Sequence, residues 1–151
     1  MVYVDTSALV PMFVGEPRSA GVTAWLRREA AAGLCSANWC VTEMASALAQ
    51  KWRTGQIDVA TLDDVWASFV AACDDEFLSL LPIDEDDFPR AAALCLRPDA
   101  ALRSGDALHL AVALRSGCNA MLSFDDTLNR NAQACGLAVI APRPLPTHDR
   151  R

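Results

Sequence analysis

The chain has 151 residues, of which 52% are hydrophobic and 21% are charged, and its net charge of −6 gives a pI near 4.7. This length predicts one domain, and the apolar fraction is enough for a packed core, which excludes a disordered chain. The acidic balance excludes the basic footprint that a reader of duplex DNA needs. If nucleic acid is the substrate, a source other than the side chains must supply much of the positive charge.

The apolar segments are too short to cross a membrane. The longest of them, such as residues 107–114, suit a buried helix. The N-terminus has neither the basic start nor the small-residue cleavage site of a signal peptide. We therefore expect a cytoplasmic protein with no membrane partner.

The six cysteines are scattered along the chain, and no two of them form a C-x-x-C pair. A chain of this length and apolar content does not need disulfides. Several of the cysteines stand beside Ala, Val or Leu, which is typical of small core residues. We expect six free thiols and no zinc site, at the positions Cys35, Cys40, Cys73, Cys95, Cys118 and Cys135.

The first half of the chain alternates strand-like and helix-like segments. Strands are expected over 1–4 and, more weakly, over 34–39. A short helix or turn over 7–17 is interrupted by Pro11, and helical spacing predicts a helix over 18–33. Two longer helices follow, over 41–55 and 58–75. Their expected inner faces consist of Val41, Met44, Ala45, Leu48 and Trp52, and of Leu62, Val65, Trp66, Phe69 and Val70.

The second half continues the same alternation. Strands are expected over 77–83, 119–124 and 137–141, with helices over 84–96, 104–117 and 125–136 between them. Strands alternating with helices predict a mainly parallel sheet with helices on both faces, a three-layer α/β/α sandwich. We expect one domain over 1–141 and a polar, proline-rich tail over 142–151.

Four acidic residues stand where the chemistry of such folds is usually placed. Asp5 and Asp125 directly follow expected strands, and ligands of open parallel sheets bind beyond the carboxyl ends of the strands. Asp106 and Glu43 lie near the starts of helices, with Ser104 as the expected cap of the first of these. Each acid taken alone also fits a helix cap or a charge that complements the helix dipole. The spacing does not choose between a cap and an active site.

Four segments in order resemble the signature of PIN-domain nucleases. They are "VYVDTSAL", "VTEMASAL", "RSGDALHLAVAL" and "MLSFDDTL". More specifically, the chain resembles the VapC ribonuclease toxins of type II toxin–antitoxin pairs, from Val2 to about Ile140. The resemblance implies a PIN-like sandwich and a metal-dependent endoribonuclease that cleaves RNA with a metal-activated water.

The resemblance also implies the site. It places the acidic quartet of the family on Asp5, Glu43, Asp106 and Asp125, as ligands of Mg²⁺ or Mn²⁺. Hard divalent cations prefer oxygen ligands, and clustered carboxylates repel one another unless a cation lies among them. The hydroxyl positions of the family fall on Thr6, Ser7 and Ser123, where many members have Thr in place of Ser123. Asp126 is expected to cap the helix that follows it, with a contact to the metal through water as the alternative.

The implied partners are an RNA substrate, a cognate antitoxin protein and a second copy of the chain in a homodimer. An acidic groove bordered by apolar helices favours an antitoxin segment with hydrophobic anchors and a basic side chain. The apolar stripes over 41–52 and 62–70 are the candidate contact surfaces.

Other residues of chemical interest have simpler interpretations. His109 lies three residues after Asp106, but a packed or hydrogen-bonded helix histidine is favoured over a metal ligand. The acidic run 84–87 is expected to open a helix whose apolar face consists of Phe88, Ala91 and Leu94. Trp25, Trp52 and Trp66 lie in apolar stripes and are expected to pack in the core or an interface, whereas Trp39 stays open between packing and base stacking. The candidate phosphate contacts are Arg27, Arg28, Lys51, Arg53, Arg103 and Arg130.

Two alternatives to a nuclease remain. A strand that ends in Asp-Thr-Ser resembles the start of haloacid-dehalogenase-type phosphatases, whose nucleophilic aspartate is usually followed by a second Asp where this chain has Ser7. Lys51, the only lysine, lies on an early helix and not on a late strand. The other alternative is a non-catalytic PIN-fold module that binds a partner, which the complete acidic set argues against.

Overall fold

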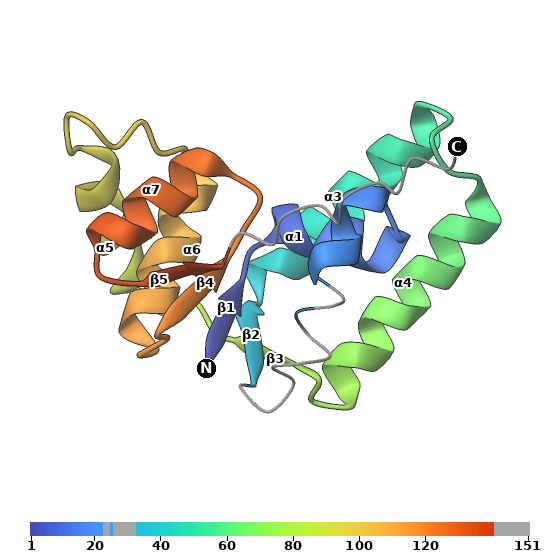
Figure 1. Cartoon of the computed structure of the whole chain (residues 1–151), viewed down its shortest axis with the longest axis horizontal. Coiled ribbons are helices and arrows are strands. Elements are labelled where there is room, and N and C mark those ends of the chain that lie inside the picture. The colour runs from blue at the N-terminus through green and yellow to red at the C-terminus, as the bar shows by residue number, and fades with distance from the viewer. Residues whose placement is uncertain (23–24, 26–32, 141–151) are drawn as a thin grey trace, which may run out of the picture.

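The computed structural model describes residues 1–22, 25 and 33–140 of the chain (Figure 1). The expected helix over 18–33 therefore lies mostly outside the described residues, and so does the tail over 142–151. No helix in the described ranges is long and apolar enough to cross a membrane.

Five strands form one sheet in the order β3-β2-β1-β4-β5, and every neighbouring pair is parallel. The chain builds outward from β1 through β2 to β3 and then returns to the other side of β1 for β4 and β5. The switch point of the topology therefore lies between β1 and β4, where open α/β sheets bind ligands. The strands are β1 (Val2–Val4), β2 (Leu34–Ala37), β3 (Leu78–Leu81), β4 (Ala120–Leu122) and β5 (Ala138–Ile140).

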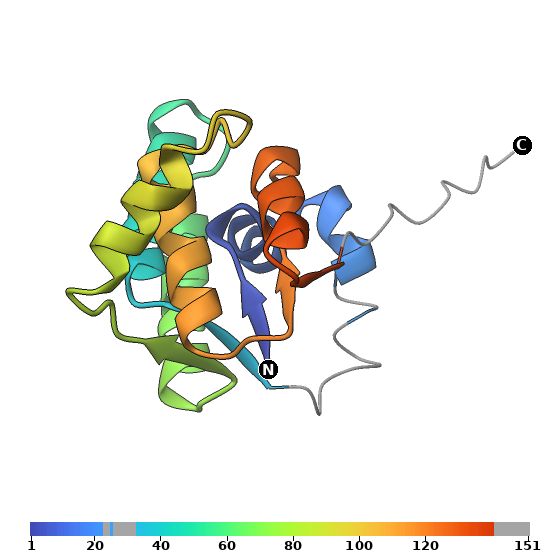
Figure 2. The ribbon, with the colours of Figure 1, turned by 90° about the vertical axis from the view of Figure 1, so that its left-hand side faces the viewer.

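Helices cover both faces of the sheet, so the expected three-layer α/β/α sandwich is confirmed (Figures 1 and 2). One face carries α1 (Thr6–Val14), α3 (Trp39–Arg53) and α4 (Val59–Asp74). The other face carries α6 (Ser104–Arg115) and α7 (Asp126–Ala134), with α5 (Asp87–Cys95) packed against α6. A short 3-10 helix, η1 (Pro17–Ser19), follows α1.

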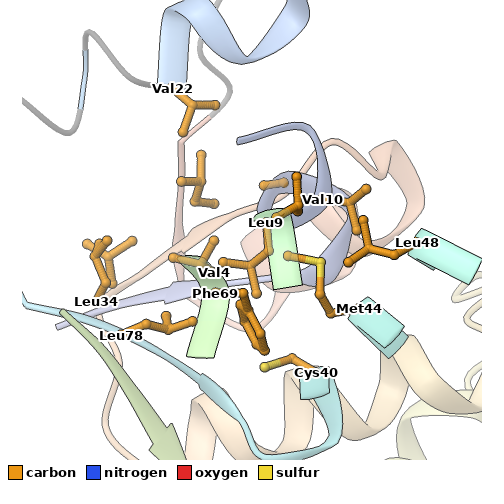
Figure 3. Close-up of a cluster of buried hydrophobic side chains, with 14 of the residues drawn as sticks. Val4, Leu9, Val10, Val22, Leu34, Cys40, Met44, Leu48, Phe69 and Leu78 are labelled. Carbon is orange, nitrogen blue, oxygen red and sulfur yellow. The ribbon is translucent and has the colours of Figure 1, made fainter. Parts of the chain in front are cut away.

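The strand alternation divides the core into two clusters, since successive side chains of a strand point to opposite faces. Val4 packs with Leu9, Met44 and Phe69 in the cluster under α1, α3 and α4 (Figure 3). Tyr3, the residue before Val4, belongs to the cluster under α6 and α7. The inner strands β1, β2 and β4 are buried along their whole length, which explains why they read as continuous apolar runs, whereas the edge strands β3 and β5 are partly exposed.

Two helix starts and one proline differ from expectation. Helix α1 continues through Pro11 and ends at Gly15, whose φ of 77° suits a residue without Cβ. Helix α3 begins at Trp39, two residues earlier than its apolar spacing predicts, so Glu43 lies one turn inside the helix and not at its end. The cap of α6 is Arg103, not Ser104, and it makes no side-chain capping bond.

The expected inner faces of the helices are correct at their centres and wrong at their edges. Val65 and Phe69 of α4 are buried, but Val70 is exposed. In α3, Met44 and Leu48 are buried, whereas Ala45 is exposed and Trp52 is 50% exposed. A helix of a three-layer sandwich buries only a narrow stripe, and residues one position outside it face solvent. Trp52 is therefore not a core residue.

The six cysteines are free, as expected. Cys35 and Cys118 are buried with their sulfur atoms 3.5 Å apart, which is a hydrogen-bond contact between thiols. The hydrogen bond with Cys118, followed by burial, raises the pKa of the Cys35 thiol. This pair is part of the core beneath α6.

Candidate active site

The four predicted acids converge at the carboxyl ends of β1 and β4. Asp5 follows β1, and its backbone N–H donates to the carbonyl of Leu122 at the end of β4 (3.0 Å). Asp125 comes three residues after that carbonyl. The register that pairs Val4 with Leu122 therefore places the two segments side by side at the switch point. Glu43 reaches the cluster from α3, since Nε2 of His109 lies 2.6 Å from Glu43 and 3.8 Å from Asp5. Asp106 reaches it from α6, where its carboxylate is repelled by the charges of Asp125 and Asp5.

Asp5 is a buried carboxylate held by three donors. Its Oδ2 accepts hydrogen bonds from the backbone N–H of Ser7 (3.2 Å), from Ser7 Oγ (2.5 Å) and from Ser123 Oγ (3.0 Å). The residue is only 4% exposed. Asp5 is thus the N-cap of α1 and also a member of the acidic cluster, so the two interpretations of this residue are compatible. The hydroxyl groups of Ser7 and Ser123 fix its orientation.

A buried hydrogen-bonded chain holds Glu43. Its Oε2 accepts from Thr6 Oγ1 (2.5 Å) and lies 2.6 Å from Nε2 of His109. The other ring nitrogen of His109 lies 2.6 Å from the hydroxyl of Tyr3, which in turn accepts from the backbone N–H of Ala37 (2.9 Å). The chain joins β2, β1, α6 and α3, so the position of Glu43 depends on the packing of the whole sheet.

His109 is a buried, hydrogen-bonded helix histidine, as its sequence context predicted. Burial acts to lower its pKa, but the hydrogen bond to Glu43 and the charges of Asp5, Glu43 and Asp106 outweigh burial and raise the pKa. Nε2 of His109 also lies 3.8 Å from Oδ1 of Asp5. A protonated ring would therefore offset part of the negative charge between Asp5 and Glu43. No local pattern predicts the link to Tyr3, which lies 106 positions away in the chain.

The carboxylates of Asp106 and Asp125 lie close enough to repel each other. Burial, and then the charges of Asp125 and Asp5, raise the pKa of Asp106 above its usual value. Oδ1 of Asp125 accepts from the backbone N–H of Leu128 (2.8 Å), so Asp125 is the N-cap of α7. The expectation that Asp126 caps this helix is wrong, because Asp126 is its first residue and is exposed.

The donor set fits a hard divalent cation. All four side chains offer carboxylate oxygens, and hydrogen bonds orient three of them, those of Asp5, Glu43 and Asp125. Within the described residues, no three Asp, Glu, His or Cys side chains form a group that could hold a metal ion. In proteins Mg²⁺ often takes only one or two carboxylates and completes its shell with water and substrate phosphate.

A second acidic group, the run 84–87, has a structural role. The side chain of Asp87 is fully buried, and both of its oxygens accept hydrogen bonds from Nε of Arg115 (2.8 and 3.0 Å). Oδ2 of Asp84 lies 3.0 Å from Nη1 of the same guanidinium. Arg115 thus fastens the start of α5 to the end of α6. The sequence predicted only that these acids open a helix and missed the ion pair.

Two of the six candidate phosphate contacts have protein partners. Lys51 forms an ion pair with Glu16 (2.6 Å), and Arg130 donates to Thr127 (3.2 Å). Arg27 and Arg28 lie outside the described residues.

Comparison with known proteins identifies the class. The family model of the PIN domain matches residues 2–134. "Ribonuclease VapC35" of Mycobacterium tuberculosis is 32% identical over 154 aligned positions, which cover 94% of this chain and 97% of that protein. "Ribonuclease VapC47" of the same species is 27% identical over 148 positions, with the same coverage. The crystal structure of PAE2754 from Pyrobaculum aerophilum has the same fold, with a TM-score of 0.58 and 18% identity over 93% of this chain and 83% of that one.

An all-parallel sheet with acids gathered at its switch point, together with these matches, defines a PIN-domain protein. The chain belongs to the PIN-domain family and is a distant homologue of the VapC ribonucleases of Mycobacterium tuberculosis.

Proposed function

We propose that the chain is a Mg²⁺- or Mn²⁺-dependent endoribonuclease that acts as the toxin of a type II toxin–antitoxin pair. The single observation that carries the proposal is the convergence of Asp5, Glu43, Asp106 and Asp125 from four separate segments. The two VapC relatives are named as ribonucleases, which supports RNA as the substrate. The nuclease domain would occupy residues 1–141, with 142–151 as a tail, in a cytoplasmic protein.

The four carboxylates would together bind the cation, and the cation would bind the substrate phosphate. Asp5, Asp106 and Asp125 with Glu43 would bind the ion, which when bound supplies a water of lowered pKa and positive charge for the phosphate. Ser7 and Ser123 keep Asp5 in place, and His109 and Thr6 keep Glu43 in place. This arrangement needs no serine, cysteine or histidine nucleophile. The bound ion would also supply, at the reaction centre, the positive charge that the acidic chain lacks.

The alternatives are less well supported. In a phosphatase with an aspartyl nucleophile, the Asp5 carboxylate would have to attack a phosphate. Here Oδ2 of Asp5 accepts hydrogen bonds from three donors, and Lys51, the only lysine, forms an ion pair with Glu16. A non-catalytic module would not need four converging acids, whose mutual repulsion destabilises the fold.

The test is metal-dependent cleavage of RNA. Purified protein is incubated with total RNA in Mn²⁺, in Mg²⁺ and in EDTA, and the new RNA ends are sequenced. We expect defined ends only with metal, and none from Asp106→Asn, while Asp126→Asn serves as a matched control that cleaves like the parent. Hydrolysis of a generic phosphomonoester without RNA cleavage would favour the phosphatase. Absence of both reactions would favour the binding module.

The proposed partners are a cognate antitoxin and a second copy of the chain. The exposed apolar residues Trp52 and Val70, on α3 and α4, are available for such contacts. Co-expression with the protein encoded beside this chain should give a stable complex that no longer cleaves RNA. If the two proteins separate on purification and cleavage is unchanged, the antitoxin assignment is wrong.

A further inference from the structure

An apolar pocket of about 380 Å³ lies between the start of α3, helix α5 and the first turns of α6. Figure 2 shows α5 and α6 side by side on this flank of the molecule. Among the described residues that line the pocket, none is charged. The main wall residues are Trp39, Ile83, Phe88, Ala91, Cys95 and Leu108.

Two aromatic rings of this wall are open to solvent. Trp39 is 40% exposed and Phe88 is 58% exposed. Phe88 was expected to face inward from α5, and its exposure is a correction of that expectation. Neither ring is needed to fill the core, so their exposed apolar area has no structural explanation within the described chain.

The pocket adjoins the acidic cluster directly. Ser104 and Gly105 line it, and the next residue is Asp106. A Cβ placed on Gly105 would lie 3.6 Å from Oε1 of Glu43 and 3.8 Å from Nε1 of Trp39. Oε1 of Glu43 and Nε1 of Trp39 therefore both lie beside Gly105, so the polar edge of the indole is near the acidic cluster while the ring lines the pocket.

We propose that this pocket binds one unstacked nucleobase of a single-stranded RNA whose backbone lies at the four carboxylates. The inference rests on the proposed ribonuclease function and adds a specificity site to it. Single-stranded RNA is recognised by bases that stack on exposed aromatic side chains. The volume lies in the usual range of small-ligand pockets, roughly 300–1,000 Å³. An uncharged wall suits a base and not a phosphate.

The position of the pocket favours a base over a protein side chain. A nucleotide whose phosphate lies beside Glu43 and Asp106 carries its own base within one sugar of that phosphate. Trp39 and Gly105 stand at the boundary between the two regions, so the pocket is the nearest apolar surface for such a base. An antitoxin segment would need two separate side chains, a hydrophobic anchor for the pocket and a basic group for the acids, whereas one nucleotide carries both the base and the phosphate. Protein occupancy is therefore the competing outcome of the test.

The experiment measures how much binding depends on bases. Two probes are used, an oligoadenylate dodecamer and a ribose-phosphate dodecamer without bases, with Ca²⁺ in place of Mg²⁺ to limit cleavage. Fluorescence anisotropy gives the Kd of the parent and of Phe88→Ala, Trp39→Leu and Trp39→Phe. The matched control is Phe77→Ala, which removes a 47% exposed aromatic ring that does not line the pocket.

We expect the parent to bind oligoadenylate more tightly than the abasic chain by roughly 5- to 100-fold, the range for one stacked base. Phe88→Ala and Trp39→Leu should lose most of this ratio, and Phe77→Ala should keep it. Trp39→Phe loses the indole N–H near Glu43 but keeps an aromatic ring. Because the ring is the part that stacks on a base, this variant should retain the binding ratio. Melting curves verify that each variant is folded. Phe88→Ala should remain folded, because Phe88 is exposed and its truncation leaves no cavity in the core.

The outcomes separate the pocket from the proposed enzyme. If the ratio is lost only in the pocket variants, the base site stands, even when the parent cleaves no RNA. If the parent cleaves RNA but the ratio is the same in all variants, the ribonuclease stands and the base site is overturned. If Phe88→Ala leaves the ratio intact but abolishes antitoxin binding or dimer formation, the pocket is a protein contact and the proposal is also overturned.

Discussion

Replacing Asp106 by Asn should make the protein more stable without metal and less responsive to metal. Asp106 is half-buried, and its carboxylate is repelled by Asp125 and Asp5. An acid whose pKa is raised by folding contributes stability at a pH below its ordinary value, and the contribution is lost as the pH rises through the folded pKa. At pH 7 the ionised group therefore opposes folding, and Asn keeps the shape while removing the charge.

The size of the effect follows from two opposing contributions. Removing unfavourable charge contacts typically stabilises a protein by about 0.5–2 kcal/mol. Asn also loses the attraction of an anion to the start of α6, where Asp106 lies in the first turn, which costs about 0.3–1 kcal/mol. The net change in the free energy of unfolding spans about −0.5 to +1.7 kcal/mol, with a central gain of about 0.6 kcal/mol, equivalent to about 1–2.5 °C in Tm for a chain of this size.

Metal should reverse the order of the two proteins. At a hundredfold excess over its Kd, a cation that binds only the folded parent adds about 2.7 kcal/mol, or roughly 5–11 °C. Asp106→Asn should gain much less. The assay is calorimetric melting in EDTA and in Mn²⁺, with Asp126→Asn as the exposed control that should follow the parent. Equal metal shifts for the parent and Asp106→Asn, with a lower Tm of the variant in EDTA, would refute the role of Asp106.

Substitutions at three further positions test separate parts of the structure. Asp5→Ala should lower the free energy of unfolding by about 0.5–2 kcal/mol from the lost cap alone, whereas Asp5→Asn should nearly keep the fold in chemical denaturation and still lose RNA cleavage. Arg115→Met should cost about 1.5–3 kcal/mol at pH 7, because the buried Asp87 loses its charged hydrogen bonds. Burial acts to raise the pKa of Asp87, but the hydrogen bonds from Arg115 and Asp84 and the charges of Arg115 and Arg90 together outweigh burial and lower the pKa. The parent should therefore lose stability as the pH falls through that lowered pKa, and urea titrations across pH should find a smaller acid loss in Arg115→Met. Gly105→Ala meets Glu43 only at ordinary contact distance, so it should unfold at the same or a higher denaturant concentration, by up to about 1 kcal/mol; a clear loss would contradict the geometry of the α6 start.

The fold was readable from the chain because its signals are local. Strands buried on both faces read as short apolar runs, and helices show apolar spacing, so the alternation alone predicts a parallel sandwich. The errors fall at the edges of elements. The early start of α3 at Trp39 and the exposure of Val70 and Phe88 depend on how far neighbouring helices cover one another, which no single segment encodes.

The acidic quartet was predicted by resemblance, while its convergence required the fold. Asp5 and Ser123 are 118 positions apart in the chain and 3.0 Å apart in space. Only the return of the chain to the other side of β1 brings them together, and a carboxylate has the same local signature whether it caps a helix or lines a site. In the tertiary structure Asp5 caps α1 and also lies in the acidic cluster, 3.8 Å from Nε2 of His109.

Residue patterns along the chain predict the α/β/α sandwich, the placement of the four acids after strands and near helix starts, and the free cysteines. The side chains that hold and surround those acids follow only from the packing of distant segments. The chain from Tyr3 through His109 to Glu43, the clasp of Arg115 on Asp87 and the pocket beside Trp39 each join segments distant in sequence. The physical reason is that hydrogen bonds and pockets act over a few ångströms in space, whereas sequence patterns report only neighbours along the chain.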